Sequence, residues 1–562
     1  MGASRAGGAG WACRGFWGGG VRTTREQGRA GAGRRPTVRE ATFDLLRELG
    51  MTTVFGNPGS TELPFLSGFP EDFSYVLGLH EGAVVGMADG YAQGRGRPAL
   101  VNLHTAPGLG NASAAIMTAY LNRTPLVIVA GQQDRRHLAA EPFLAGRLTE
   151  MAQPYVKWSS QPVRAEDVPA AIARAYHLAA QPPAGPAFVA VPQDDWEAVA
   201  GEVPRHRVVH RARPDERELE RAARALEAAR SPAIVAGAGV DRSGAWEDTV
   251  RLAEKLTAAA WADPFASRAG FPQDHPLFRG HLSPAQAALA EELSGHDVVL
   301  VLGAPVFRYY RYLPGPVVAE GTELLHVTDD PEEAARAPVG VSLVGDVALA
   351  VRHLLGSVRP SGRPAPQPPP APPAPRAAEP LPVDYALYAV GRALPEEAVV
   401  VEETPSSKPL LHRYIRVRRP GGFYSAASGG LGFGVSAAVG LSIADPERPV
   451  VCVVGDGSLA YGLQALWSAG RYARRVVFVV LNNRQYRVLR LLARRDGLGG
   501  GLPGTNLEGL DPEGAARSLG CPAETVRGAG ELEEALGRAL ASGGPRLLNV
   551  LVDPESPRDM WG

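Results

Sequence analysis

Two apolar stretches near the carboxyl end of the chain are each followed at once by polar side chains that could bind a metal ion. Residues 450–454 lead into Gly455-Asp456-Gly457, and residues 476–481 lead into Asn482-Asn483. Such β-branched runs are typical of buried strands, and the helical segment expected between them, from about 459 to 472, completes a βαβ unit. Open α/β sheets bind ligands at the carboxyl ends of their strands, which is where these polar residues stand.

The residue types at these strand ends suit a metal ion and a phosphorylated ligand. Mg²⁺ takes a few protein oxygens, such as the carboxylate of Asp456 and the side-chain carbonyl of Asn483, and completes its shell with water and phosphate oxygens. Gly455 and Gly457 have no side chains to keep a phosphate group from the backbone. Gly-Asp-Gly alone would be equally typical of a turn, so the interpretation depends on the whole pattern.

That pattern, with 24 residues between Gly457 and Asn482, resembles the signature of thiamine diphosphate enzymes. The resemblance implies that the cofactors are thiamine diphosphate and Mg²⁺. It assigns the metal to Asp456, Asn483 and the main-chain carbonyl of Gln485, and diphosphate contacts to Gly455, Gly457 and Ser458. The family also uses a glutamate that hydrogen-bonds the aminopyrimidine ring and so promotes removal of the thiazolium C2 proton. Glu81, within LGLHEGAVVGMADGYA (77–92), matches that glutamate.

Segments spread from about residue 40 to 555 are similar to the benzoylformate decarboxylase family. They are VFGNPGSTELPFL (54–66), VNLHTAPGLGN (101–111), FPQDHPLFRGH (271–281), GAPVFRYY (303–310) and SGGLGFG (428–434). The family places one serine and two histidines around the substrate. By resemblance, Ser60 would hold the substrate carboxylate, His104 would donate a proton after CO₂ leaves, and His275 would assist binding and product release. Histidine suits this because its ordinary pKa lies near neutral pH.

Further cofactor contacts are implied by the same resemblance. Leu431 would force the bent shape of the cofactor, Gly429 would offer a carbonyl to its amino group, and Ser406 would lie near it. The chain departs from the family at positions that line the substrate cavity, where Leu492 and Ser425 replace aromatic side chains. Pro405 and Ser406 also replace part of a Thr/Ser pair. We therefore expect an altered side-chain pocket, for an aliphatic or substituted aromatic 2-keto acid.

The implied reaction is nonoxidative decarboxylation of a 2-keto acid, benzoylformate or a similar compound, to an aldehyde and CO₂ through the cofactor ylide. The resemblance also implies a homotetramer, a dimer of dimers with active sites at subunit interfaces. An acetolactate synthase-like carboligase shares the fold, Glu81 and the metal motif, but the relay histidines argue against it. Pyruvate decarboxylases carry paired histidines where this chain has only His104. The sequence is also compatible with a decarboxylase of aliphatic acids and with a non-catalytic paralogue that binds the cofactor.

Composition excludes several classes of function. The net charge of −1 gives no electrostatic footprint for nucleic acid or an anionic membrane. No apolar run reaches 18 residues, the length of a candidate membrane span. The three cysteines, Cys13, Cys452 and Cys521, are too widely spaced to indicate a disulfide framework, which favours a reducing cytoplasm.

Strand and helix patterns alternate along most of the chain, which predicts an α/β protein. We expect three domains, each a mainly parallel sheet with flanking helices: the thiamine diphosphate-binding fold twice, and a Rossmann-like domain between them. Gly-Ala-Gly within 232–240 lacks the third glycine of a dinucleotide site and is interpreted as an ordinary turn. The expected divisions are a disordered extension (1–36), a pyrimidine-binding domain (37–204), a central domain (205–358), a Pro-rich linker (359–383) and a diphosphate- and metal-binding domain (384–562). A helix is expected over 37–49, and strands over 52–56, 75–79, 98–104, 125–131, 186–192, 232–240 and 297–307.

Overall fold

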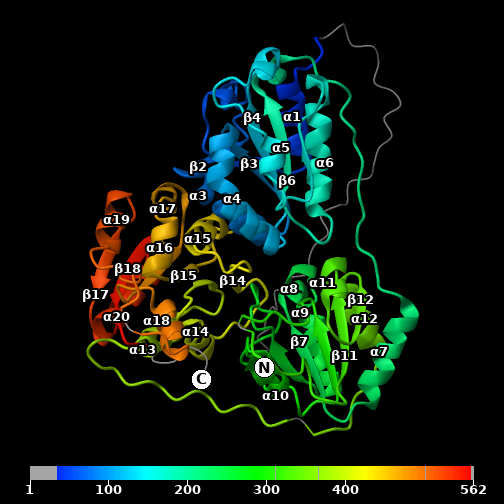
Figure 1. The fold of residues 1–562 in the computed structure, drawn as a ribbon, viewed down its shortest axis with the longest axis vertical. Coiled ribbons are helices and arrows are strands. Elements are labelled where there is room, and N and C mark those ends of the chain that lie inside the picture. Colours follow the sequence, from blue (N-terminus) through cyan, green and yellow to red (C-terminus); the bar gives the residue numbers. More distant parts are fainter. Residues whose placement is uncertain (1–33, 311, 365, 500, 558–562) are drawn as a thin grey trace, which may run out of the picture.

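The computed structural model describes residues 34–557 except 311, 365 and 500. Three six-stranded sheets follow one another along the chain, and all strand pairings within them are parallel. The first sheet lies at the top of Figure 1, the second at the lower right and the third at the lower left. The predicted α/β class with three parallel-sheet domains is therefore confirmed. The predicted extension falls almost wholly outside the described residues.

The first sheet has the strand order β2-β1-β3-β4-β6-β5. Its strands are β1 (Thr53–Gly56), β2 (Ser74–Leu77), β3 (Ala99–Leu103), β4 (Leu126–Gln132), β5 (Ser159–Ser160) and β6 (Ala187–Pro192). Its helices are α1 (Val38–Glu48), α2 (Leu63–Leu66), α3 (Glu81–Arg95), α4 (Thr105–Leu121), α5 (Leu148–Met151) and α6 (Val168–Ala180). α1 begins where predicted because Thr37 and Glu40 form a capping box.

The central sheet has the order β12-β11-β10-β7-β8-β9. Its strands are β7 (Pro232–Ala236), β8 (Ala259–Ala262), β9 (Phe278–His281), β10 (Val298–Leu302), β11 (Glu323–Thr328) and β12 (Val341–Val344). Its helices are α7 (Glu216–Ala228), α8 (Ala238–Ser243), α9 (Trp246–Leu256), α10 (Gln286–Glu292), α11 (Pro331–Arg336) and α12 (Val347–Ser357). Gly-Ala-Gly forms the turn from β7 into the short helix α8, as expected.

The third sheet has the order β14-β13-β15-β16-β18-β17. Its strands are β13 (Val399–Glu403), β14 (Phe423–Ser425), β15 (Val450–Gly455), β16 (Val476–Asn482), β17 (Ala523–Val526) and β18 (Arg546–Leu551). Its helices are α13 (Val383–Ala393), α14 (Lys408–Tyr414), α15 (Phe433–Ala444), α16 (Asp456–Gly462), α17 (Ala465–Tyr472), α18 (Arg487–Arg495), α19 (Pro512–Ser518) and α20 (Ala529–Ala541). The described residues between α12 and α13 form no helix or strand.

The first and third domains meet through α3 and α15, whose backbones touch. A Cβ atom on Gly440 of α15 would lie 1.9 Å from the carbonyl oxygen of Met87, and one on Gly90 of α3 would lie 2.2 Å from that of Ala437. Only glycine allows helices to approach this closely. The contact joins buried residues of both domains into one hydrophobic core.

Replacing Gly440 with alanine should therefore destabilise the protein, by about 3 kcal/mol, because the new methyl group meets backbone that cannot rotate away. Gly537 in α20 is the matched control, since a Cβ there meets nothing within 4 Å, and its alanine variant should gain up to about 1 kcal/mol from helix propensity. Thermal unfolding of the two variants measures the difference. Equal midpoints would show that α3 and α15 do not pack this closely.

Candidate active site

The predicted metal and diphosphate segment begins at the carboxyl end of β15. α16 starts at Asp456 itself, three residues earlier than expected, and α16 and α17 are two helices where one was predicted. That part of the prediction was wrong. Because α16 begins at Asp456, the carboxylate of this residue lies in the first turn of a helix. Free main-chain N–H groups and the helix dipole favour an anion there.

Asp456, Asn483 and Gln485 lie together at the ends of β15 and β16. Asp456 Oδ1 accepts a hydrogen bond from the Gly457 N–H at 2.9 Å, and Oδ2 accepts one from the Arg484 N–H at 2.7 Å. Asn483 Oδ1 accepts from the Gln485 N–H at 3.1 Å, and the Gln485 carbonyl accepts from the Arg487 N–H at 2.9 Å. Burial raises the pKa of Asp456 to about 6, although its main-chain partners lower it.

This donor set fits a hard cation that also binds phosphate. One carboxylate and two amide carbonyls supply few protein ligands and a single negative charge, which leaves coordination positions for diphosphate oxygens and water. Within the part of the chain that the structure describes, no group of three His, Cys, Asp or Glu side chains could hold a metal by itself. A cation at Asp456 would thus depend on the phosphorylated ligand to complete its shell.

The other cofactor residues predicted in the third domain border the same cavity, except Gly429, which is not among its lining residues. Its lining includes Ser406, Leu431, Gly455, Asp456, Gly457, Ser458, Asn483 and Gln485. The two glycines differ in the space beside them. A Cβ on Gly457 would lie 2.5 Å from the Tyr486 ring, whereas one on Gly455 would meet only Ser458 Oγ, at 3.8 Å. Gly457 is therefore required by packing, and Gly455 leaves open space that a phosphate could use.

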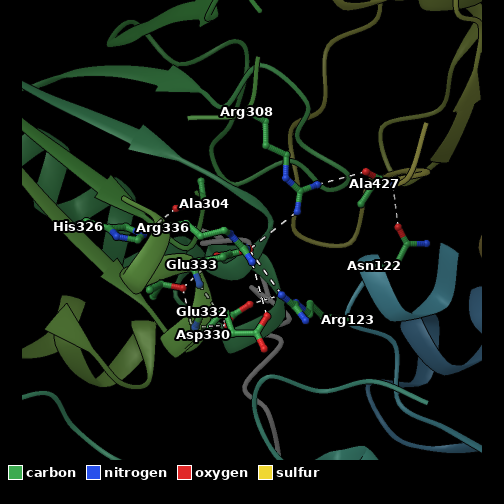
Figure 2. Close-up of polar contacts among 11 residues, drawn as sticks. Asn122, Arg123, Ala304, Arg308, His326, Asp330, Glu332, Glu333, Arg336 and Ala427 are labelled. Atoms are coloured by element: carbon green, nitrogen blue, oxygen red, sulfur yellow. Dashed lines mark hydrogen bonds and ion pairs between the residues drawn. The ribbon is translucent and has the colours of Figure 1, made fainter. Parts of the chain in front are cut away.

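The loop that carries Gly429 and Leu431 is held by contacts from all three domains. The Ala427 N–H donates to Asn122 Oδ1 at 2.8 Å, and the Ala427 carbonyl accepts from Arg308 at 3.2 Å; Figure 2 shows both side chains reaching this residue. Beside them, Arg123 of the first domain pairs with Asp330 and Glu333 of the central domain. The loop is therefore fixed at the junction of the domains.

A buried carboxylate anchors the other end of that loop. Glu403 accepts hydrogen bonds from the Gly432 N–H at 2.7 Å and the Gly434 N–H at 2.6 Å. Burial raises the pKa of Glu403 to about 7, while these main-chain hydrogen bonds lower it. Gly429 has φ 70°, a left-handed conformation that favours glycine.

Glu81 is buried at the first turn of α3, where two amide side chains hold its carboxylate. Asn57 donates to Oε1 at 3.1 Å and Asn111 donates to Oε2 at 3.0 Å. Gly108 keeps the space beside it open, because a Cβ there would lie 3.2 Å from Oε1. A carboxylate fixed in this way can hold one constant orientation toward a ring nitrogen. The sequence interpretation included Glu81 but neither asparagine as its partner.

His104 directly follows β3 and faces residues of the segment 59–62. Its Nδ1 lies 2.8 Å from Glu62 Oε2 and 3.2 Å from Thr61 Oγ1. Glu62 is 1% exposed and also accepts hydrogen bonds from the main-chain N–H groups of Gly59 and Gly131. A carboxylate at Nδ1 places the proton on that nitrogen and leaves Nε2 available for proton transfer. Sequence reasoning missed Glu62.

Ser60 stands next to this pair, exposed at the start of a 3₁₀ turn, η1 (Ser60–Glu62). Gly59, not Ser60, is the residue that caps the turn. Ser60 and His104 are thus brought together by one short segment. The Ser60 hydroxyl is next in the chain to Thr61, a partner of His104, and it is exposed and therefore available to a ligand.

Replacing Glu62 with glutamine should lower the turnover number about 100-fold, because the amide no longer fixes the His104 tautomer. Affinity for thiamine diphosphate should stay unchanged, since Glu62 lies away from the cavity lined by Asp456. Steady-state kinetics and calorimetric titration of the cofactor measure the two quantities. Wild-type turnover in the variant would remove Glu62 from the proton-transfer apparatus.

His275 lies apart from these groups. Its Nε2 is 3.3 Å from Glu254 Oε1 on α9, its Nδ1 accepts from the Leu277 N–H at 3.2 Å, and its ring packs on Phe271. Across the described residues, no polar contact joins His275 to Glu81, Ser60 or His104. The role implied for His275 by resemblance therefore stays a prediction without support from the geometry of this chain.

Comparison with known proteins agrees with this arrangement along nearly the whole chain. The thiamine pyrophosphate enzyme domains match in order: the N-terminal TPP binding domain over residues 36–157, the central domain over 219–354, and the C-terminal TPP binding domain over 406–550. Benzoylformate decarboxylase of Pseudomonas aeruginosa is 45% identical over 534 residues, which are 93% of this chain and 100% of that protein.

Two solved structures extend the likeness to three dimensions. Benzoylformate decarboxylase from Polynucleobacter necessarius is 42% identical with a TM-score of 0.89, covering 92% of this chain and 98% of that one. A thiamine diphosphate-dependent 4-hydroxybenzoylformate decarboxylase from Rhodococcus jostii RHA1 is 43% identical with a TM-score of 0.89, covering 92% and 99%. The chain belongs to the thiamine pyrophosphate enzymes, in the benzoylformate decarboxylase family.

Proposed function

We propose that this chain decarboxylates a 2-keto acid, benzoylformate or a close analogue, to the aldehyde and CO₂, with thiamine diphosphate and Mg²⁺ as its cofactors. The observation that carries the proposal is the cavity that Asp456, Asn483 and Leu431 share. Those residues are the ones that a diphosphate, its metal ion and a bent cofactor require. Membership of the family supplies the reaction type, and Glu81 and the His104–Glu62 pair of the first domain supply the proton chemistry.

The predicted site residues have the following tasks in this proposal. Asp456, Asn483 and the Gln485 carbonyl hold Mg²⁺, and Gly455, Gly457 and Ser458 face the diphosphate. When bound, thiamine diphosphate supplies a nucleophilic carbon and accepts the electron pair released as CO₂ leaves. Glu81 hydrogen-bonds the aminopyrimidine ring, with its orientation fixed by the two asparagines. Gly429 offers its carbonyl to the amino group of that ring, and Ser406 lies beside the cofactor.

The substrate is held and protonated by the first domain. Ser60 binds the substrate carboxylate, which fixes the keto carbon for attack. His104 donates its Nε2 proton to the carbon that loses CO₂, while Glu62 stabilises the charged ring through Nδ1. His275 of the central domain would act only in substrate entry or product release.

The proposed assembly is a homotetramer, a dimer of dimers, in the cytoplasm. Glu81 begins α3 of the first domain and Asp456 begins α16 of the third, so one cofactor needs both types of domain. By resemblance to the family, we propose that the two domains of each active site come from different subunits. None of the described helices is both long and apolar enough to cross a membrane. Light scattering across a concentration series would measure the assembly, and turnover by an isolated monomer would contradict shared sites.

Release of CO₂ by the purified protein, with thiamine diphosphate and Mg²⁺, tests the reaction. Benzoylformate, pyruvate and a branched aliphatic 2-keto acid are compared, with aldehyde measured in parallel. The aryl acid is expected to have the highest kcat/KM. Acetolactate formed from pyruvate would show a carboligase instead, and cofactor binding without CO₂ from any acid would show a non-catalytic paralogue.

A further inference from the structure

α18 begins with an arginine that is almost completely buried. Arg487 is 1% exposed and lies two residues after Gln485, in the turn that also carries Asn483. Desolvation disfavours a guanidinium in such a position, and so does the positive end of the dipole of α18. The Arg487 side chain is therefore kept there by specific polar partners.

Those partners are main-chain carbonyl groups near the carboxyl end of the chain. We define the C-terminal segment as residues 553–557. Arg487 Nη2 donates to the Glu555 carbonyl at 2.6 Å and to the Pro557 carbonyl at 3.0 Å, and Nε donates to the Pro557 carbonyl at 3.2 Å. Nη1 lies 3.3 Å from the Glu555 carboxylate, which supplies the counter-charge. A planar guanidinium fork can make several such bonds at once.

The C-terminal segment is bonded to three residues that line the proposed cofactor cavity. Arg487 is the first of them. Gln485 is the second, because its side-chain amide donates to the Pro554 carbonyl. Val383 is the third, because its main-chain N–H donates to Ser556 Oγ at 3.2 Å. The segment therefore joins the start of α13 to the turn before α18 at the cavity wall.

The C-terminal segment needs these contacts because it has no regular structure of its own. Residues 552–557 belong to no helix or strand, and the two prolines of the segment have no N–H to donate. Main-chain carbonyl groups in such a segment must find partners outside a helix or sheet. The Asp553 N–H anchors one end of the segment on the Leu381 carbonyl at 2.8 Å, and Arg487 anchors the other end.

The same contacts restrain the turn that would bind the metal ion. The Gln485 N–H donates to Asn483 Oδ1 at 3.1 Å, and the Gln485 carbonyl accepts from the Arg487 N–H at 2.9 Å. The Gln485 side chain is held by the C-terminal segment. Groups that hydrogen-bond a metal ligand from outside fix its orientation. The two neutral oxygens proposed to bind Mg²⁺ therefore belong to a turn that the segment supports.

We propose that Arg487 is a positioning residue for the metal ion, which it supports by holding the C-terminal segment against the turn of Asn483 and Gln485. Loss of Arg487 would let that turn move. The effect would depend on the cation, because Mg²⁺ requires nearly ideal octahedral geometry, whereas Ca²⁺ accepts a flexible shell. This inference rests on the proposed function, since that function places the metal ion at Asp456.

Calorimetric titration of thiamine diphosphate in saturating Mg²⁺ or saturating Ca²⁺ tests this role. Arg487→Met removes every donor of the side chain. With Mg²⁺ it should raise the apparent Kd about 10- to 100-fold, the usual effect of losing a group that orients a metal ligand. With Ca²⁺ the Kd should rise at most about 3-fold, because that cation tolerates a distorted shell. A purely structural role would weaken binding with both cations to the same extent.

A second variant addresses the same contact from the other side. Gln485→Met keeps the main-chain carbonyl proposed as a ligand but loses the bond to Pro554, so its Kd should rise selectively with Mg²⁺, by about 10-fold. This variant leaves the buried guanidinium in place, and it therefore tests the proposal even if Arg487→Met folds poorly. Arg487→Lys keeps a cation but has a single nitrogen, so its Kd should fall between those of the wild type and Arg487→Met.

Arg494→Met is the matched control. Arg494 lies on the same helix and donates to the Glu555 carboxylate at 2.9 Å, but its side chain is 58% exposed and its described contacts include no main-chain carbonyl of the segment. Its variant should bind the cofactor as the wild type does with either cation. Hydrogen exchange of the protein without cofactor gives a further readout. The C-terminal segment of Arg487→Met should exchange at least about 10-fold faster than in the wild type, whereas β15 and β16 stay protected.

Equal losses of affinity with Mg²⁺ and Ca²⁺ in both Arg487→Met and Gln485→Met, or unchanged affinity with both cations, would overturn the inference. Wild-type exchange rates in the C-terminal segment of Arg487→Met would overturn it too. Failure of the proposed reaction would look different. A selective loss with Mg²⁺ in the variants, without CO₂ release by the wild type from any 2-keto acid, would refute the reaction and retain the role of Arg487. CO₂ release by a wild type whose variants keep its ratio of Kd values would do the reverse.

Discussion

Replacing Asp456 with alanine is expected to abolish the metal-dependent binding of thiamine diphosphate, raising its apparent Kd at least about 100-fold. The physical reason is that the proposed site has a single carboxylate, and its other proposed protein ligands are the neutral oxygens of Asn483 and Gln485. Removing the one negative charge leaves a dication among amides, and the diphosphate then loses the cation that links it to the protein. Calorimetric titration with and without Mg²⁺ measures the effect.

Two further variants make this prediction specific. Asp456→Asn keeps the shape and one carbonyl oxygen, so its Kd should fall between those of the wild type and the alanine variant. Glu534→Ala removes an exposed carboxylate from α20 and should bind the cofactor as the wild type does. Retained affinity in Asp456→Ala, at unchanged Mg²⁺ dependence, would show that the metal lies elsewhere.

The parts of the site that sequence can predict are those that stand at the ends of strands. An apolar run marks a buried strand by composition alone, and the polar residue that ends it must lie at the ligand-binding edge of a parallel sheet. This reasoning places Asp456 and Asn483, which the structure brings into one cavity, whereas Glu81 is assigned by resemblance to the family. The break between α16 and α17 follows Gly462, a residue that weakens a helix, so the sequence does carry a local signal for it.

The groups that sequence reasoning misses are partners across long separations. Glu62 acts through His104 and through the Gly131 N–H, 42 and 69 residues away. Its position in NPGSTE indicates only a turn. The signal that could have found Glu62 is that its carboxylate stands beside an apolar segment. Arg487 has no motif at all, since a buried arginine at a helix start becomes meaningful only when the C-terminal segment is seen beside it.

His275 illustrates a role that rests on resemblance alone. The segment FPQDHPLFRGH is similar to the family, and the similarity gives its histidine a family role. Similar local sequences form similar turns, and in this structure the Phe278 N–H donates to the His275 carbonyl at 2.9 Å within the turn. Local similarity does not determine which histidine reaches the substrate, because that depends on how domains and subunits meet.

Replacing Glu81 with glutamine should slow exchange of the C2 proton of bound thiamine diphosphate by about 10² to 10⁴-fold, the usual contribution of a positioned acid or base. Glutamine has nearly the same shape, so Asn57 can still donate to its carbonyl oxygen. Asn111 would face the new amide group and can turn its own carbonyl toward it. We therefore expect the fold and the affinity for the cofactor to change little, whereas the exchange rate changes greatly.

The contrast with Glu62→Gln separates the two proton-transfer groups. Exchange of the C2 proton, followed by NMR after rapid acid quenching, needs no substrate and therefore does not involve His104. Glu62→Gln should exchange at the wild-type rate and lose turnover, whereas Glu81→Gln should lose both. Unchanged exchange in Glu81→Gln would mean that its buried carboxylate only stabilises the first turn of α3, as a carboxylate there can without any catalytic role.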